Sequence, residues 1–157
     1  MTKYLTSDSD EFGTPKALFD NLNTEFGFTL DPCASVFNHK CTKYFTKEVD
    51  GLVQPWVGET IFMNPPYSRP NKYPWMEKAY QVSTCGTTVV CLMPSDTDSR
   101  WWHEFAMKGE IRFIKGRVKF EGGASGARAC HSIIVLGKKW ESIFKPGFCI
   151  AGTQNQT

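Results

Sequence analysis

The sequence predicts an α/β sandwich, in which helices pack on a mostly parallel sheet with an antiparallel edge. Apolar segments of strand length alternate along the chain with segments of helical periodicity. The segment 88–93 is almost continuously apolar, which is typical of a strand that is buried on both faces of a parallel sheet. Residues 112–114 and 118–120 flank Gly116 and predict a pair of strands that forms the antiparallel edge.

The first half of the chain predicts one helix and three short strands. Thr14-Pro15 offers a capping hydroxyl followed by proline at the first helical position, and Gly27 is a typical helix end. Strands are expected at 28–30, 44–45 and 61–63, the first of them stopping at Asp31-Pro32.

The second half predicts two more helices and the remaining strands. Pro74 is expected to open a helix that Gly86 closes, and residues 99–107 show a second helical pattern. The last strand is expected at 131–136, after which the apolar pattern fades.

Length and composition indicate one compact domain. The chain has 157 residues, so we expect a single domain over 1–150 and a disordered polar tail over 151–157. A formal net charge of +2 means that any nucleic-acid surface must be local. No apolar run is long enough to span a membrane, and the N-terminus lacks the apolar stretch of a signal peptide, so a cytoplasmic protein is expected.

The six cysteines include no Cys-x-x-Cys pair. Cys33, His39 and Cys41 lie close together in sequence, but their spacing fits no standard zinc pattern and a fourth ligand is not evident. We therefore expect no metal site and reduced, mostly buried thiols.

The most informative motif is Asn64-Pro65-Pro66-Tyr67, directly after the apolar run 60–63. The two prolines stiffen the backbone and remove two N–H donors, which leaves carbonyl acceptors without competing donors. The Asn64 amide adds a side-chain acceptor, and Tyr67 adds a flat ring. Such a loop is suited to hold an exocyclic amine while a planar base stacks on the tyrosine, although a plain Pro-Pro turn is the simpler structural interpretation.

Asp31-Pro32 and Asn64-Pro65 both follow predicted strands. Ligands of open α/β sheets bind beyond the carboxyl ends of the strands, so these two segments are expected to share one site.

The tetrapeptide resembles the motif of the amino-methyltransferases that use S-adenosylmethionine, and the chain as a whole is similar to the phage and prophage DNA N6-adenine methyltransferases. The resemblance spans about residues 10–137 and rests on further segments at 12–15, 30–34, 44–45, 50–52, Trp56, 101–102 and 114–120. It implies a Rossmann-like methyltransferase fold, S-adenosylmethionine as cofactor and adenine in DNA as substrate. An adenine inside a duplex cannot reach such a pocket, so the base must be flipped out or single-stranded.

The resemblance also implies roles for individual residues. The catalytic set is Asn64, Pro65, Pro66 and Tyr67, and the expected cofactor-binding set is Thr14, Pro15, Asp31, Pro32, Cys33 and Asp50. In this set the carboxylate of Asp31 is the leading candidate partner of the α-amino group of S-adenosylmethionine. In the wider family a glycine-rich turn follows the Asp-Pro, and the segment 33–35 contains no glycine.

Four cations within eight residues, at 112, 115, 117 and 119, predict a basic surface, although an ordinary solvated strand face would look the same. The DNA-binding candidates are Arg69, Lys72, Lys115, Arg117 and Lys119. The only segments left for base readout are the short loops at 68–74 and 121–130, which predicts a short or relaxed target sequence. His103 and His131 have no evident partner in the sequence and are interpreted as structural.

Two other functions remain open on the sequence. One keeps the motif but changes the acceptor to cytosine N4, an RNA base or a protein glutamine. The other is a non-catalytic nucleic-acid-binding module of the same fold.

Overall fold

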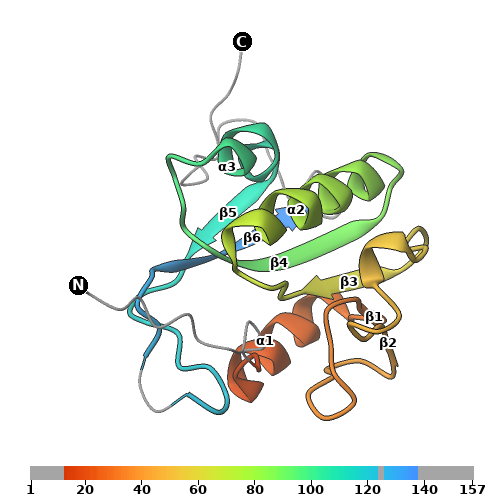
Figure 1. The fold of residues 1–157 in the computed structure, drawn as a ribbon, viewed down its shortest axis with the longest axis horizontal. Helices are drawn as coiled ribbons and strands as arrows, with labels where there is room; N and C mark the ends of the chain where they lie inside the picture. The colour runs from red at the N-terminus through yellow and green to blue at the C-terminus, as the bar shows by residue number, and fades with distance from the viewer. Residues whose placement is uncertain (1–12, 124–125, 138–157) are drawn as a thin grey trace.

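The computed structural model describes residues 13–123 and 126–137 (Figure 1). The described part of the chain begins just before a helix and ends with a strand of the sheet. Its elements are α1 (Lys16–Phe26), β1 (Leu30–Asp31), β2 (Lys43–Tyr44), the 3₁₀ helix η1 (Gly51–Val53), β3 (Thr60–Met63), α2 (Arg69–Thr84), β4 (Thr88–Pro94), α3 (Arg100–Glu104), the 3₁₀ helix η2 (Ala106–Lys108), β5 (Glu110–Phe113) and β6 (His131–Leu136).

The described strands form one six-stranded sheet in the order β2-β1-β3-β4-β6-β5. Strands β2, β1, β3 and β4 are parallel to one another, whereas β6 runs antiparallel to both β4 and β5. The predicted α/β sandwich with an antiparallel edge is therefore confirmed, and it is compatible with a Rossmann-like methyltransferase fold.

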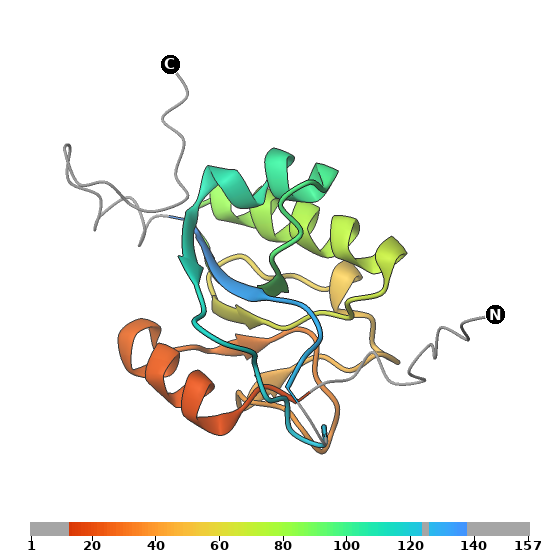
Figure 2. The same ribbon diagram turned by 90° about the vertical axis from the view of Figure 1, so that its left-hand side faces the viewer.

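Helices cover both faces of the sheet. Figures 1 and 2 show α2 and α3 on one face and α1 on the other. The strands accordingly alternate between two buried clusters. In β3, Ile61 and Met63 belong to the cluster under α2 and α3, while Phe62 between them packs with Phe19 and Leu22 of α1.

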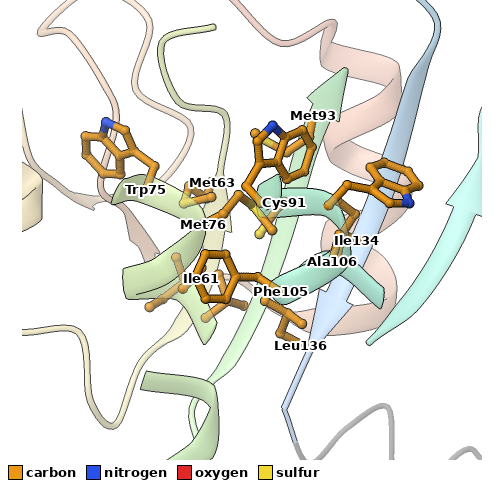
Figure 3. Packing of buried hydrophobic residues seen from close by; sticks show 14 of the residues in the cluster. Ile61, Met63, Trp75, Met76, Cys91, Met93, Phe105, Ala106, Ile134 and Leu136 are labelled. Carbon is orange, nitrogen blue, oxygen red and sulfur yellow. The ribbon is translucent and has the colours of Figure 1, made fainter. Parts of the chain in front are cut away.

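The cluster under α2 and α3 is the larger one (Figure 3). Trp75 and Met76 of α2 and Phe105 after α3 pack there on Cys91 and Ile134 of the central strands. These central strands are buried on both faces, which is the physical reason for the near-continuous apolar run in β4.

The prediction for the start of α2 is wrong. The helix begins at Arg69, with Pro70 in its first turn, and Pro74 lies inside it. Pro70 lacks a backbone N–H where the helix would leave that donor without an intrahelical partner, whereas Pro74 in the second turn removes one helical hydrogen bond. The expected loop at 68–74 is consequently the first part of a helix.

The predicted strand at 118–120 is also wrong, because strand β5 pairs with β6 instead. Val118 and Phe120 are buried and Lys119 is exposed, so the predicted alternation is present without a strand ladder. The segment is held by single backbone bonds, from the Ala127 N–H to the Val118 carbonyl (2.8 Å) and from the Glu121 N–H to the Gly13 carbonyl (2.8 Å).

The helix predicted at 99–107 is divided, because α3 ends at Glu104 and the 3₁₀ helix η2 follows it. The other elements lie within two residues of their predicted positions, and Gly27 ends α1 in the left-handed conformation, as expected. The predicted tail at 151–157 lies outside the described residues. Within the described ranges, no helix has the length and apolar character needed to cross a membrane.

Candidate active site

The two predicted site segments share one edge of the sheet. β1 and β3 are parallel neighbours, with Leu30 opposite Ile61, so Asp31-Pro32 and Asn64-Pro65 leave the sheet on the same side. Because β6 is antiparallel to β4, its first residue, His131, lies at this same edge, opposite Pro94.

Asn64 is held between Thr14 and Tyr67. Its Nδ2 donates to the hydroxyl of Thr14 (3.0 Å), and its Oδ1 accepts from the hydroxyl of Tyr67 (2.5 Å). Thr14 is 3% exposed, and no side-chain hydrogen bond caps α1, whose N-cap is Pro15. The predicted capping role of Thr14 is therefore wrong, and its hydroxyl contacts the proposed catalytic amide instead.

The single hydrogen of the Tyr67 hydroxyl has two acceptors within reach, the Oδ1 of Asn64 and the carbonyl of Leu92 at 2.9 Å, and is shared between them. Burial raises the pKa of Tyr67 well above its usual value, so the hydroxyl keeps its proton and remains a donor. This donor fixes the tyrosine ring to β4 and orients the amide of Asn64.

The ring of Tyr67 packs in an aromatic cluster. Its centroid lies 6.0 Å from that of Phe120 and 5.4 Å from that of His131, and the Phe120 and His131 rings are 5.2 Å apart. The segment between β5 and β6 therefore reaches the proposed catalytic tyrosine.

Asp31 is buried, with 5% of its surface exposed. Its carboxylate accepts from the backbone N–H groups of Lys40 (3.0 Å) and Cys33 (3.3 Å). Burial raises the pKa of Asp31 above its usual value, and these N–H groups only partly oppose the effect. The Cys33 thiol contacts the backbone N–H of Asn64, which connects the ends of β1 and β3.

Asp50 lies next to the turn after β1. It is exposed, adopts a positive φ of 57° and accepts from the Leu52 N–H (3.1 Å) at the start of η1. A Cβ at Gly51 would lie 2.1 Å from the Pro32 carbonyl oxygen, so only glycine allows this close approach. The structure thus brings Pro32 and Asp50 near each other.

The predicted DNA-binding cations fall into two groups. Lys72 is paired with Asp96 (2.5 Å), so its charge is compensated. Arg69 at the start of α2 is exposed, as are the three cations of the segment after β5, which are Lys115, Arg117 and Lys119. Arg117 donates to the carbonyl of Arg128 (2.7 Å).

Arg112 does not belong to this basic surface, because it forms a bidentate ion pair with Glu25 of α1 (2.7 Å for both bonds).

Four contacts of Asn64 and Tyr67 do not follow from reasoning on the sequence: those with the Thr14 hydroxyl, the Leu92 carbonyl, the Phe120 ring and the His131 ring. The position of His131 at this edge could have been predicted from the expected order of the strands. An antiparallel last strand starts where its parallel neighbours end, so its first residue belongs at the predicted binding edge.

Comparison with known proteins identifies the family. The model of the family described as DNA N-6-adenine-methyltransferase (Dam) matches residues 1–155. A DNA N-6-adenine-methyltransferase of Haemophilus phage HP1 is 36% identical over 133 residues, which cover 80% of this chain and 76% of that protein. The chain belongs to the Dam family.

A second relative is the DNA N-6-adenine-methyltransferase of Escherichia phage T1, with 30% identity over 134 residues. The match covers 69% of this chain and 56% of the T1 protein, so the chain spans little more than half the length of that relative.

Membership of the Dam family confirms the predicted class of enzyme, an adenine-specific DNA methyltransferase. A Dam enzyme needs a methyl donor and acts on DNA. In the part of the chain that the structure describes, no group of three or more His, Cys, Asp or Glu side chains is arranged to hold a metal ion.

Proposed function

We propose that this Dam-family chain transfers a methyl group from S-adenosylmethionine to the N6 amine of adenine in DNA, with Asn64, Pro65, Pro66 and Tyr67 as its catalytic loop. The observation that supports this most is the oriented amide of Asn64, held by Thr14 and Tyr67 at the sheet edge that also contains Asp31. The relatives from phages HP1 and T1 support the same reaction. We place its action in the cytoplasm of a bacterial or phage-infected cell, where the DNA lies.

The amine of adenine is a weak nucleophile because its lone pair is delocalised into the ring. The Oδ1 of Asn64 and the carbonyl of Pro65 accept the two amine hydrogens and draw the nitrogen toward tetrahedral geometry. These hydrogen bonds strengthen as positive charge develops on the nitrogen, so they stabilise the transition state more than the ground state. The ring of Tyr67 stacks on the base, and its hydroxyl holds Asn64 in place.

The residues present fit S-adenosylmethionine, which supplies an electrophilic sulfonium methyl when bound. Asp31 is a buried carboxylate whose pKa is raised by burial, and the α-amino group of the cofactor is a cation that would favour its ionised form. Pro32, Cys33 and Asp50 surround the same turn, and Pro15 adjoins Thr14. The missing glycine after Pro32 means that side chains, rather than bare backbone, line this part of the site.

DNA approaches from the side of the segment after β5. Lys115, Arg117 and Lys119 are exposed there, and Phe120 of the same segment contacts Tyr67. Arg69 and Lys72 stand just after the catalytic loop, although Lys72 must first exchange Asp96 for a phosphate. A flipped-out or single-stranded adenine then reaches Tyr67, and the short segments available for readout favour a short or relaxed target.

Mass spectrometry of nucleosides from DNA of expressing cells tests this function. We expect N6-methyladenine with the wild-type chain and none above background with Asn64→Ala. In vitro, the loss of this preorganised acceptor should lower kcat by about 10²–10³-fold while calorimetry still detects cofactor binding. N4-methylcytosine, or a methylated RNA or protein in place of DNA, would assign one of the other acceptors, and no methyl transfer at all would indicate a binding module.

A further inference from the structure

Lys40 is a largely buried cation in the loop that encloses Asp31, and the proposed mechanism does not use it. Only 15% of its side chain is exposed, although a lysine ammonium normally lies in water. Its backbone N–H donates to the Oδ2 of Asp31 (3.0 Å). Burial raises the pKa of Asp31, and the charge of Lys40 is among the weaker influences that oppose this rise. A positive charge therefore lies close to the proposed cofactor carboxylate.

The ammonium group of Lys40 has donors to spare. Its hydrogen-bond partner among the described residues is the Oε2 of Glu121, at 3.2 Å. An ammonium carries three hydrogens, so two remain for a further acceptor. The side chain of Glu121 is 47% exposed, and an ion pair with such a partner contributes little to stability. This pair alone does not explain why a lysine is kept in a largely buried place.

Glu121 brings the Lys40 ammonium to the segment 13–15. The Glu121 N–H donates to the Gly13 carbonyl (2.8 Å). A Cβ at Gly13 would lie 3.1 Å from the Oε2 of Glu121, which is the atom that Lys40 contacts. The ammonium of Lys40 thus lies where the loop after β1 meets the segment of Thr14 and Pro15, and both of these parts belong to the proposed cofactor site.

The amino-acid end of S-adenosylmethionine carries an ammonium and a carboxylate on the same carbon. Asp31 is the proposed partner of the ammonium, but the carboxylate has no charged partner yet. The hydroxyl of Thr14 is neutral and already accepts from the Asn64 amide. A carboxylate that leaves water for a partly buried site needs a cation or several donors to offset its lost hydration. The site therefore requires a positive charge near Asp31.

We propose that Lys40 binds the α-carboxylate of S-adenosylmethionine, so that Asp31 and Lys40 together hold the two opposite charges of the amino-acid end. This inference rests on the proposed function. Because both groups of the ligand stand on one carbon, their partners must be neighbours, and the bond from the Lys40 N–H to Asp31 makes them so. The two hydrogens of the ammonium that Glu121 does not use are the donors to the carboxylate.

Calorimetry with two ligands tests the contact without turnover. We expect Lys40→Met, which keeps most of the apolar stem, to bind S-adenosylmethionine about 10–30-fold more weakly, as for one lost charge-assisted hydrogen bond. Decarboxylated S-adenosylmethionine keeps the ammonium and the sulfonium but lacks the carboxylate. The wild-type chain should bind this analogue more weakly than the cofactor, and Lys40→Met should bind it at least as well as the wild type does. An equal loss of affinity for both ligands in Lys40→Met overturns the proposal.

Glu121→Gln separates ligand binding from a purely structural role. If Lys40 only ties the loop after β1 to Glu121, removing either charge breaks the same ion pair, and both variants should lose the same affinity. If Lys40 binds the carboxylate, Glu121→Gln removes a competing anion and should bind S-adenosylmethionine at least as tightly as the wild type. Equal losses in Lys40→Met and Glu121→Gln would therefore refute the contact.

The matched control is Lys43→Met. Lys43 is the first residue of β2 and pairs with Glu59 (2.5 Å), which precedes β3, so this ion pair lies at the amino ends of the parallel strands, opposite the site. The control should keep the wild-type affinity for both ligands. A wild-type chain that binds the two ligands equally well overturns only the role of Lys40. A wild-type chain that binds neither ligand, or that methylates no adenine, overturns the proposed function.

Discussion

At the residue scale, one hydroxyl connects the N-terminal segment to the proposed catalytic amide of Asn64. The sequence places Thr14 near the cofactor through its resemblance to the family, and the structure shows its hydroxyl on the Asn64 amide, 50 residues further along the chain. The sequence pattern identifies Asn64 and Tyr67 because they stand in one tetrapeptide. It does not identify Thr14, Leu92 or His131 as their partners, because those contacts depend on how the strands are ordered.

Thr14→Val tests this connection. The substitution keeps the shape of the side chain and removes the hydroxyl, so Asn64 loses one of the two groups that orient it. We expect kcat to fall about 3–10-fold, as for one lost hydrogen bond, with little change in the affinity for S-adenosylmethionine. Thr14→Ser is the matched control and should keep the rate. A large loss of cofactor affinity at unchanged kcat would instead place Thr14 at the cofactor.

Asp31 predicts a pH dependence of cofactor binding. Burial raises the pKa of Asp31, so its charge is lost on acidification at a higher pH than for an ordinary aspartate. In the proposed complex the ionised form attracts the ammonium group of S-adenosylmethionine, and affinity should therefore fall as the pH drops through this raised pKa. Calorimetry across an acidic pH series measures the effect.

The stability of the cofactor-free protein should depend on pH in the opposite direction to cofactor affinity. A carboxyl with a raised pKa in the folded state contributes stability below its ordinary pKa, and this contribution disappears as the pH rises through the raised value.

Cofactor affinity that stays constant down to the ordinary aspartate range would contradict the role of Asp31.

At the element scale, the order of helices and strands was predictable and some boundaries were not. Continuous apolar runs predict buried strands such as β4, and Gly27 predicts the end of α1. Pro74 was misleading because a proline that opens a helix and a proline within its second turn look alike in sequence. The segment 118–120 was misleading because its alternation reflects burial of Val118 and Phe120 against α1 and its neighbours, not pairing with another strand.

A lysine fixes the segment that contains Asp50. Lys78 of α2 directs its ammonium group at three backbone carbonyls, those of Leu52 (2.5 Å), Gln54 (2.5 Å) and Gly51 (3.2 Å), and lies over the ring of Trp56 (4.7 Å to the centroid). One helix side chain thus holds η1 against the turn after β1.

Lys78→Met should loosen this segment. The methionine retains most of the apolar stem but removes the donor of the Leu52 and Gln54 carbonyls, whereas the Gly51 carbonyl still accepts from Trp56 Nε1 (2.8 Å). We therefore expect the free energy of unfolding to fall by about 1–3 kcal/mol in urea denaturation. Cofactor affinity should also weaken, because Asp50 and the Pro32 turn lose their support. Lys108→Met, at an exposed position on η2, is the control and should change neither quantity. Equal stability of the two variants would show that η1 holds without Lys78.

At the scale of the whole molecule, the order of the strands places the candidate site residues at one edge of the sheet. Exposed cations lie on a segment that contacts this site. The chain has a formal net charge of only +2, yet Lys115, Arg117 and Lys119 are exposed on one segment that also packs Phe120 on Tyr67, the proposed catalytic tyrosine. Since 68–74 is largely helical, the segment after β5 is the principal candidate left for contact with DNA on this side.

DNA affinity should therefore depend on these three cations and on salt. The triple variant Lys115→Gln, Arg117→Gln, Lys119→Gln removes about three phosphate contacts. The slope of log affinity against log salt should become shallower by about 3, since each contact contributes about 0.9.

A matched control removes the same charge elsewhere. Lys16→Gln, Lys43→Gln, Lys108→Gln lowers the net charge equally, but Lys16 and Lys43 are paired with Asp20 and Glu59 and Lys108 lies on η2. Fluorescence anisotropy over a salt series should show the wild-type slope for this control. If both triple variants lose the same slope, DNA responds to net charge alone. If neither loses it, the phosphates lie on a different face and the base must enter the site from another side.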